Sequence, residues 1–276
     1  MDYFFYPSSV AVFGSFKEGA IAYEILRNIV EGGFEGRIIL VNPKGGTVEV
    51  AGKTFEIDKK LYEPVDTAII AIPAKFVPSL IEEIGPLIKG AVVISAGFSE
   101  VGNGELEREL IEKARKHGVR IIGPNCAGIF GVHGKFFGSF EVRVRPGGLA
   151  LISQSGAFGG AALAMGNDEG IGFSAFVSYG NAADLNESDF LEYFADDENT
   201  KAIALYIEGV KDGRRFLEAL RYASERKPVI VLKAGKSASG AKAAASHTGS
   251  LAGSYEIYRA AFKQAGVIEV EEMEEL

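Results

Sequence analysis

Runs of apolar residues that stop at a glycine or an Asn-Pro pair recur along this chain, and segments with helical spacing follow most of them. The runs are continuously apolar, which is typical of strands buried on both faces of a parallel sheet. Parallel strands in turn require right-handed helical crossovers. The chain is therefore constrained to the α/β class. In its first half the expected strands are residues 9–14, 37–41, 67–72, 91–95 and 119–125.

The same rhythm returns after residues 131–148, where it fades in a way that is typical of a domain connection. In the second half the expected strands are residues 148–152, 173–178, 201–207, 228–233 and 266–270. A chain of 276 residues is long enough for two domains that each bury a core. We therefore predict two Rossmann/flavodoxin-like parallel-sheet domains in tandem, residues 1–128 and 129–276.

The composition excludes several classes of protein. A net charge of -8 argues against nonspecific binding to nucleic acid or to an anionic membrane. No apolar run is long enough to span a bilayer, and the start of the sequence lacks the basic region of a signal peptide. The single cysteine, Cys126, excludes an intrachain disulfide and fits a reducing cytoplasm. One thiol and three scattered histidines also make a dedicated metal site unexpected.

The ligand of such a sheet lies beyond the carboxyl ends of its strands. In the first half we expect the residues at these ends to converge on one nucleotide-like ligand. They are Gly14, Ser15, Phe16, Asn42, Pro43, Lys44, Ile72, Ala96, Asn125 and Cys126.

The end of the second strand narrows the kind of ligand. An NAD site would have Asp or Glu there for the ribose hydroxyls, whereas this chain has Asn42, Pro43 and Lys44. A lysine suits a ligand with phosphate on or near its ribose, such as NADP or coenzyme A, although a solvated turn lysine is an equal alternative. For Cys126, a small buried filler is favoured over a reactive thiol, which would need a lowered pKa.

The second half begins with a possible anion site. Ser153, Ser155 and Gly156 follow an expected strand and open an Ala-rich helix, so hydroxyls, backbone N–H groups and the positive end of the helix dipole meet there. This pattern predicts a phosphate or oxyanion site. The alternative is a plain serine cap, for which one serine would suffice.

His247 lies among small residues in the stretch 246–253. Glu208 ends the strand expected at 201–207, on the ligand side of the sheet, where its carboxylate could orient an imidazole. An imidazole is largely an unprotonated nucleophile at neutral pH and can carry a phosphoryl group. His247 alone would be interpreted as a structural histidine, and Glu208 with the serine turn favours the phosphoryl carrier.

Seven motifs in this order resemble those of the nucleoside-diphosphate-forming acyl-CoA synthetases, the superfamily of succinyl-CoA synthetase α subunits and ADP-forming acetyl-CoA synthetases. The resemblance covers essentially the whole chain, and the ADP-forming branch fits best. The motifs are SVAVFG at 9–14, VNPKGG at 41–46, VISAGFSE at 93–100, GPN at 123–125, ISQSG at 152–156, YIEG at 206–209 and SHTG at 246–249.

The resemblance implies a ligase reaction in which acyl-CoA, phosphate and ADP give acid, CoA and ATP, reversibly. CoA would lie across the strand-end residues of the first half, with its thiol near Asn125 and Cys126. Phosphate would be held by Ser153, Ser155 and Gly156, and His247, oriented by Glu208, would take the phosphoryl group. ATP or ADP with Mg would bind an ATP-grasp β subunit, so the chain would be incomplete alone and would form a hetero-oligomer.

Three alternatives stay open at this point. The chain could be a non-catalytic CoA-binding regulatory protein, or a nicotinamide-dependent oxidoreductase, which the missing acidic residue disfavours. It could also be part of a longer α chain. The acyl group stays open between acetyl, branched-chain, aryl and succinyl, as does ADP against GDP.

Overall fold

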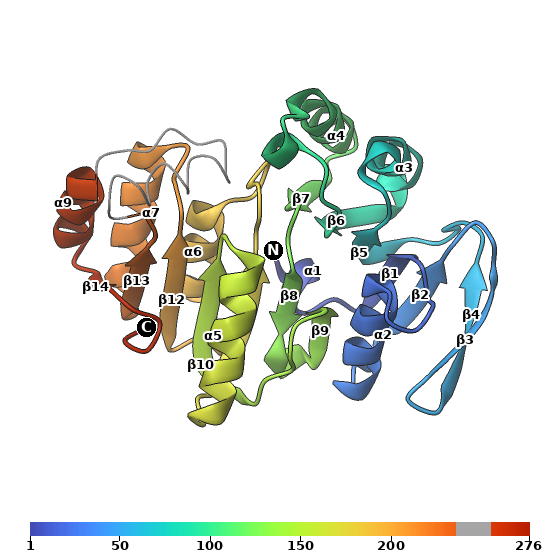
Figure 1. The fold of residues 1–276 in the computed structure, drawn as a ribbon, viewed down its shortest axis with the longest axis horizontal. Coiled ribbons are helices and arrows are strands. Elements are labelled where there is room, and N and C mark those ends of the chain that lie inside the picture. The colour runs from blue at the N-terminus through green and yellow to red at the C-terminus, as the bar shows by residue number, and fades with distance from the viewer. Residues whose placement is uncertain (236–254) are drawn as a thin grey trace.

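The computed structural model describes residues 1–235 and 255–276, and these residues form two seven-stranded sheets that lie side by side (Figure 1). The first sheet contains β1 (Ser9–Gly14), β2 (Arg37–Val41), β3 (Gly46–Val50), β4 (Lys53–Asp58), β5 (Val65–Ala71), β6 (Ile88–Val93) and β7 (Arg120–Ile122). The second contains β8 (Gly128–Gly131), β9 (Phe136–Ser139), β10 (Pro146–Ser153), β11 (Phe173–Ser178), β12 (Ala202–Ile207), β13 (Val229–Lys233) and β14 (Ile268–Val270).

The first sheet has the strand order β3-β4-β2-β1-β5-β6-β7. Its strands are parallel except for the hairpin of β3 and β4 at one edge. Every residue of β1 is buried, as the continuous apolar run requires. From β1 the chain goes first to β2 on one side and later to β5 on the other, so the topological switch point lies between β1 and β5.

The second sheet has the order β14-β13-β12-β10-β11-β8-β9. Strands β10 to β14 are parallel in a flavodoxin-like order, and β8 and β9 are antiparallel additions at the edge beside β11. The switch point lies between β10 and β12. Each sheet therefore places one crevice at its carboxyl edge.

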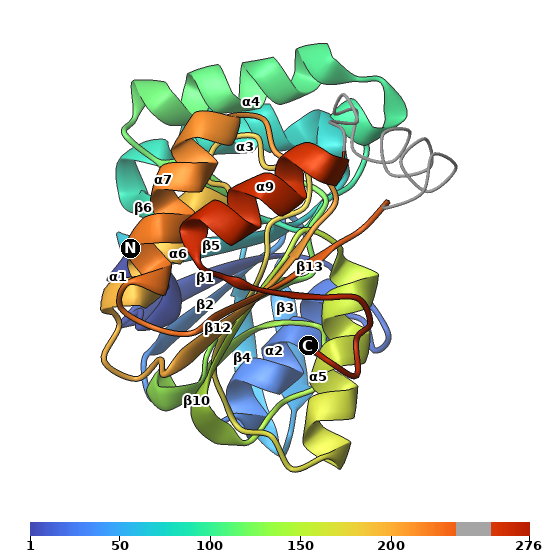
Figure 2. The same cartoon turned by 90° about the vertical axis from the view of Figure 1, so that its left-hand side faces the viewer.

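The helices cover both faces of each sheet. In Figure 2, α7 and α9 lie on one face of the second sheet and α5 on the other. The described α-helices are α1 (Asp2–Phe5), α2 (Ile21–Glu31), α3 (Val77–Ile84), α4 (Gly104–Lys116), α5 (Gly156–Asp168), α6 (Glu187–Asp196), α7 (Gly213–Ser224) and α9 (Tyr255–Ala265). Short 3₁₀ helices cover Ala74–Phe76, Gly85–Leu87, Ser99–Val101 and Val132–Gly134.

Two helices join the halves of the molecule. From α2, the buried Asn28 donates from Nδ2 to the backbone oxygens of Ser139 and Glu141, both at 2.8 Å. From α1, the ring of Phe5 lies 5.0 Å from that of Tyr193 and 4.9 Å from that of Phe194 in α6. The largest buried apolar cluster accordingly draws side chains from both sheets.

The predicted fold class, two parallel-sheet α/β units in tandem, is confirmed, with local differences. Residues 131–148 do not form a bare connection, because they contain β9 with its four buried residues. The hairpin of β3 and β4 was not expected, since its strands are mostly exposed and carry no apolar run. In the described part of the chain, no helix combines the length and apolar character that crossing a bilayer demands.

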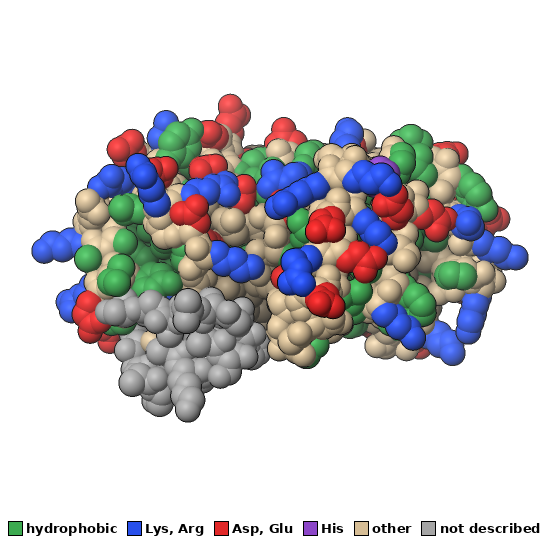
Figure 3. Space-filling model, turned by 90° about the horizontal axis from the view of Figure 1, so that it is seen from above, with side chains coloured by type: hydrophobic (Ala, Val, Ile, Leu, Met, Phe, Trp, Pro, Cys, Tyr) green, Lys and Arg blue, Asp and Glu red, His purple; other side chains and the backbone are tan. Residues whose placement is uncertain are grey.

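Charged side chains of both signs share the surface near α3 and α4. Figure 3 shows Lys and Arg interspersed with Asp and Glu on the face seen from above. The charges on this face therefore do not form a patch of one sign.

Candidate functional site

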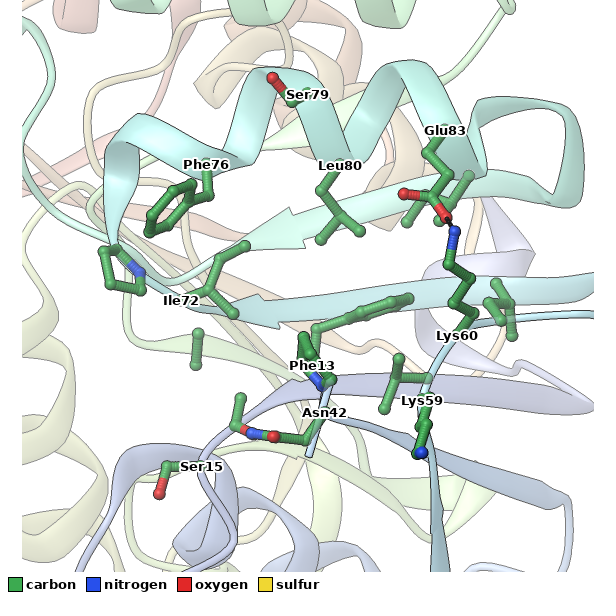
Figure 4. A pocket seen from close by; sticks show the side chains of 17 residues that line it. Phe13, Ser15, Asn42, Lys59, Lys60, Ile72, Phe76, Ser79, Leu80 and Glu83 are labelled. Atoms are coloured by element: carbon green, nitrogen blue, oxygen red, sulfur yellow. Dashed lines mark hydrogen bonds and ion pairs between the residues drawn. The ribbon is translucent and has the colours of Figure 1, made fainter. Parts of the chain in front are cut away.

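A cavity of about 610 Å³ lies at the switch point of the first sheet. Figure 4 shows Phe76 and Leu80 reaching into it from the helical side, opposite Phe13, with Ile72 between them. These four side chains give the cavity an apolar interior. Its size and its place at the carboxyl edge of a parallel sheet are those of a nucleotide-sized ligand site.

The rim of this cavity is fixed by Asn42. Its Nδ2 donates to the backbone oxygen of Gly14 at 2.7 Å, and its Oδ1 accepts from the backbone N–H of Lys44 at 3.0 Å. One amide therefore ties the loop after β1 to the loop after β2. Asn42 acts here as a structural clamp at the cavity mouth.

Two lysines supply positive charge to the cavity, and the sequence analysis missed both. Lys59 and Lys60 follow β4 and line the cavity, and Lys60 Nζ lies 3.1 Å from Glu83 Oε1 (Figure 4). They were missed because β4 itself was not expected. Once a strand is assigned to residues 53–58, the adjacent lysines become strand-end residues and hence candidates for anion contacts.

A second cavity, of about 530 Å³, lies at the switch point of the second sheet. Its walls come from the carboxyl ends of β10, β11 and β12 and from the segment that joins the two sheets. The lining residues are Ile21, Ile94, Asn125, Cys126, Ala127, Phe140, Glu141, Gln154, Ser155, Gly156, Ala157, Gly180, Asn181 and Glu208.

The start of α5 forms one wall of the second cavity. Ser155 is the N-cap, and its side chain accepts from the backbone N–H of Phe158 at 3.3 Å. Ser153 is completely buried, and its hydroxyl donates to the backbone oxygen of Ser155 at 2.6 Å. Ser153 thus stabilises the turn without lining the cavity, while Ser155 and Gly156 place the helix N-terminus at the cavity.

Gln154 connects this turn to Glu208. Its Oε1 accepts from the backbone N–H of Glu208 at 2.7 Å and from that of Gly209 at 3.1 Å. The backbone oxygen of Glu208 also accepts from Lys233 Nζ at 2.9 Å. The strand ends of β10, β12 and β13 are therefore locked together, and the Glu208 side chain lies at the same cavity as the start of α5.

The segment between the sheets contributes Asn125 and Cys126 to the second cavity. The peptide between Gly123 and Pro124 is cis, and Asn125 has a positive φ of 58°. The Cys126 thiol donates to the backbone oxygen of Val93 at 3.3 Å, and burial raises its pKa to about 12. A thiol held neutral in this way fits the filler interpretation and not that of a nucleophile.

Burial also raises the pKa of two carboxyl groups, one at the second cavity and one at the start of α6. Glu141 lines the cavity, and burial raises its pKa. Glu187, at the start of α6, is 4% exposed, and burial raises its pKa to about 7 against the opposing effect of its own backbone hydrogen bond. Neither group was predicted from sequence, because burial depends on contacts that are distant along the chain.

The structure brings most of the predicted residues to one of the two cavities. Gly14, Ser15, Asn42, Pro43 and Ile72 line the first, and Asn125, Cys126, Ser155, Gly156 and Glu208 line the second. Four predicted residues line neither cavity: Phe16 and Ser153 are buried, and Lys44 and Ala96 are exposed elsewhere. His247 lies outside the described residues.

Comparison with known proteins finds two family models along the chain. The family model for a CoA binding domain matches residues 8–131, and that for a succinyl-CoA ligase like flavodoxin domain matches residues 146–276. The α subunit of acetate–CoA ligase (ADP-forming) I of Pyrococcus furiosus is 52% identical over 97% of this chain and 60% of its own length. The acetate–CoA ligase (ADP-forming) I of Archaeoglobus fulgidus is 51% identical over 100% of this chain and 41% of its own.

Solved structures agree with these relatives. The dinucleotide-forming acetyl-coenzyme A synthetase 1 of Ca. Korarchaeum cryptofilum, in complex with phosphate and ADP, superposes with a TM-score of 0.93 at 42% identity. The match covers 99% of this chain and 60% of that one, so the chain spans 41% to 60% of the length of these relatives. Both domain models, these identities and the shared fold show that the chain belongs to the ADP-forming acyl-CoA synthetase family.

Proposed function

We propose that this chain is the CoA-binding and phosphoryl-carrying part of an ADP-forming acyl-CoA synthetase. The observation that carries the proposal is the pairing of two cavities at the two switch points, each lined by strand-end residues of its sheet. The first suits a nucleotide-like moiety and the second an anion. The reaction would convert acyl-CoA, phosphate and ADP into acid, CoA and ATP, reversibly.

The residues of the first cavity fit coenzyme A. An adenine ring would find apolar surface from Ile72, Phe76 and Leu80, and Lys59 and Lys60 would face its phosphates. The pantetheine arm would run toward Asn125, which lies at the second cavity. We also propose that the boundary between the CoA-binding unit and the second unit lies near residue 128.

The second cavity would hold the acyl group and phosphate. A phosphate oxygen would attack the thioester carbonyl carbon, the carbon–sulfur bond would break, and the sulfur would leave with CoA. Backbone N–H groups at Ser155 and Gly156 and the Ser155 hydroxyl would bind the phosphoryl oxygens of the resulting acyl phosphate. Phosphoryl transfer to an imidazole nitrogen then releases the carboxylic acid.

We infer that His247 is this acceptor and that Glu208 orients it. The relatives named as α subunits support a partner chain, and we propose an ATP-grasp β subunit that holds ADP or ATP with Mg. The phosphohistidine would pass its phosphoryl group to ADP on that partner. The working protein would then be a cytoplasmic hetero-oligomer.

The test is phosphorylation of the full chain with its β subunit by labelled ATP. We expect an acid-labile, alkali-stable label that disappears in His247→Ala and persists in His133→Ala, a matched change at an exposed histidine. A label that survives in His247→Ala would refute the assignment. CoA binding without any phosphorylation would instead support the non-catalytic regulatory alternative.

A further inference from the structure

A nearly buried amide lies where the two halves of the molecule meet. Asn181, 9% exposed, follows β11, and its Nδ2 lies 2.6 Å from Glu100 Oε2, 2.8 Å from Glu107 Oε2 and 3.1 Å from Ser99 Oγ. Its Oδ1 accepts from Asn125 Nδ2 at 3.2 Å. Both Nδ2 and Oδ1 of Asn181 therefore make hydrogen bonds.

The chemistry of these partners fixes the orientation of the Asn181 side-chain amide, that is, which partners its NH₂ and its oxygen face. An ionised carboxylate can only accept hydrogen bonds, so Glu100 and Glu107 both require the NH₂ end of Asn181. The oxygen of Asn181 must then face Asn125, and an oxygen can only receive the NH₂ end of that second amide. The polarity set by two carboxylates is thus passed through Asn181 to Asn125.

The carboxylates are themselves held in place. Glu100 accepts from the backbone N–H of Phe98 at 3.1 Å, and Glu107 accepts from Ser99 Oγ at 2.7 Å. Burial would raise the pKa of Glu100, but hydrogen bonds, first of all from Asn181, outweigh burial and lower it. Glu100 is therefore ionised at neutral pH and can only accept.

The hydrogen bonds that join Glu100 and Glu107 through Asn181 to Asn125 form a relay, and this relay ends at the second cavity. Asn125 lines that cavity, and its Oδ1 has no hydrogen-bond partner among the described residues. One N–H of Asn125 Nδ2 is committed to Asn181, and Oδ1 is the acceptor of this amide that is left for a ligand. A ligand group that binds this oxygen must bring a donor hydrogen.

We propose that Asn181 is a positioning residue that holds the Asn125 amide so that its oxygen accepts a hydrogen bond from the end of the pantetheine arm of CoA. The identity of this ligand rests on the proposed function. Two donors of the arm share this chemistry, the terminal amide N–H and the thiol S–H. The relay also makes the second cavity depend on residues of the first half of the chain.

The binding test compares CoA with S-methyl-CoA, which keeps the amide N–H and lacks the thiol hydrogen. Titration calorimetry on the full chain should show Asn181→Ala and Asn125→Gly binding CoA about threefold to tenfold more weakly than wild type, the value of one hydrogen bond. Asn103→Ala is the matched control, since Asn103 is exposed in the loop that carries Glu100, and its side chain bonds only to the Gly97 oxygen among the described residues.

The two ligands distinguish the two donors. If the thiol is the donor, the variants weaken CoA alone, and if the amide is the donor, they weaken both ligands equally. Wild-type affinity of Asn181→Ala and Asn125→Gly for both ligands would overturn the proposal.

A substitution by aspartate tests the polarity directly. The carboxyl group that Asn181→Asp introduces faces Glu100 and Glu107, with Lys211 Nζ, 2.8 Å from the backbone oxygen of Asn181, as the nearby cation. When ionised, this carboxyl group is repelled by the two carboxylates, and when protonated it can donate to one of them and still accept from Asn125. The CoA affinity of the variant, expressed relative to wild type at the same pH, should therefore recover as pH falls from 8 to 6. A ratio to wild type that does not change with pH would contradict the relay.

A measurement without ligand separates this proposal from the proposed function. The side-chain NH₂ protons of Asn125, followed by NMR in the wild-type chain, should exchange more slowly than those of Asn103. Equal, solvent-like exchange would overturn the relay even if CoA binds. Slow exchange in a chain that fails to bind CoA would uphold the relay and refute the proposed function instead.

Discussion

The contact between Gly14 and α2 shows how little room the first cavity leaves for change. A Cβ atom built on Gly14 would lie 2.5 Å from the Cβ of Ala22 and 3.0 Å from the backbone oxygen of Ala71. Neither neighbour can move away cheaply, since one is on a packed helix and the other is main chain. We expect Gly14→Ala to lower the free energy of unfolding by about 1–3 kcal/mol, measured by urea denaturation. Gly213→Ala, with nothing within 4 Å, is the control and should not destabilise.

Asp66 gives a pH-dependent prediction. Burial would raise its pKa, but hydrogen bonds from Lys89 and Ser8 outweigh burial and lower the pKa to about 2 from 3.8. A lowered pKa contributes stability that is complete above pH 3.8 and is lost as pH falls through about 2. Asp66→Asn should therefore cost about 2 kcal/mol at pH 7 and progressively less below pH 4, as measured by denaturation. The exposed Asp58→Asn is the control, and a cost for Asp66→Asn that does not change with pH would contradict the pairing.

Single residues could be predicted from sequence where a strand end and a residue type coincide. Asn42 and Glu208 were found in this way, because the apolar run before each one marks a strand. Gln154 and Asn181 were not, because their roles depend on backbone groups of Glu208 and carboxylates of another loop, 54 and 81 positions away along the chain. Local pattern carries no information about such partners.

Helix α5 combines a capping role with the proposed phosphate site, and substitutions at Ser155 can separate them. Ser155→Ala removes the acceptor for Phe158 N–H and should cost about 1 kcal/mol of stability. Ser155→Asp and Ser155→Asn both keep a cap, but only aspartate adds a negative charge where phosphate would bind. We expect Ser155→Asp to retain stability and to lose phosphate affinity, measured by phosphorus NMR titration. Ser155→Asn should also retain stability, and it should keep more phosphate affinity than Ser155→Asp. Wild-type phosphate affinity in Ser155→Asp would place the anion elsewhere.

The elements that could be predicted from sequence are the buried strands that consist of a continuous run of apolar residues. Strand β1 is buried at every position and was expected at the same residues. Strand β3 has one buried residue and pairs with β4 at the edge of the sheet, so its sequence carries no continuous apolar run. Strand β9 is buried but has only four residues, and its Phe137 lies against Gly32 at the end of α2. Such strands exist because of tertiary contacts.

At the scale of the whole molecule, the second cavity lies at the joint between the two halves. The segment from Gly123 to Asn125 leaves the first sheet, lines the second cavity and contacts the loop after β11, where the backbone N–H of Asn181 donates to the oxygen of Pro124 at 3.0 Å. A molecule extending from the first cavity to the second would pass this joint. The packing of the halves therefore determines the geometry of the second cavity, which residues of both halves line.

The shared core predicts that the halves unfold together. Phe5 belongs to the first half by sequence, is 1% exposed and packs on Tyr193 and Phe194 of α6. Phe5→Ala should lower the free energy of unfolding by about 3–5 kcal/mol, because it leaves a cavity between the halves. Tyr62→Ala, at a side chain that is 70% exposed, is the control and should have little effect.

Hydrogen exchange followed by mass spectrometry checks this cooperativity, since the core strands of a cooperative unit share one opening free energy. Peptides from β1 and from β12 should lose protection by equal amounts in Phe5→Ala, because one apolar cluster contains side chains of both strands. If β12 kept wild-type protection while β1 lost it, the two sheets would be independent folding units. The joint at Asn125 could then open without unfolding either sheet, and the two cavities would not have a fixed relative geometry.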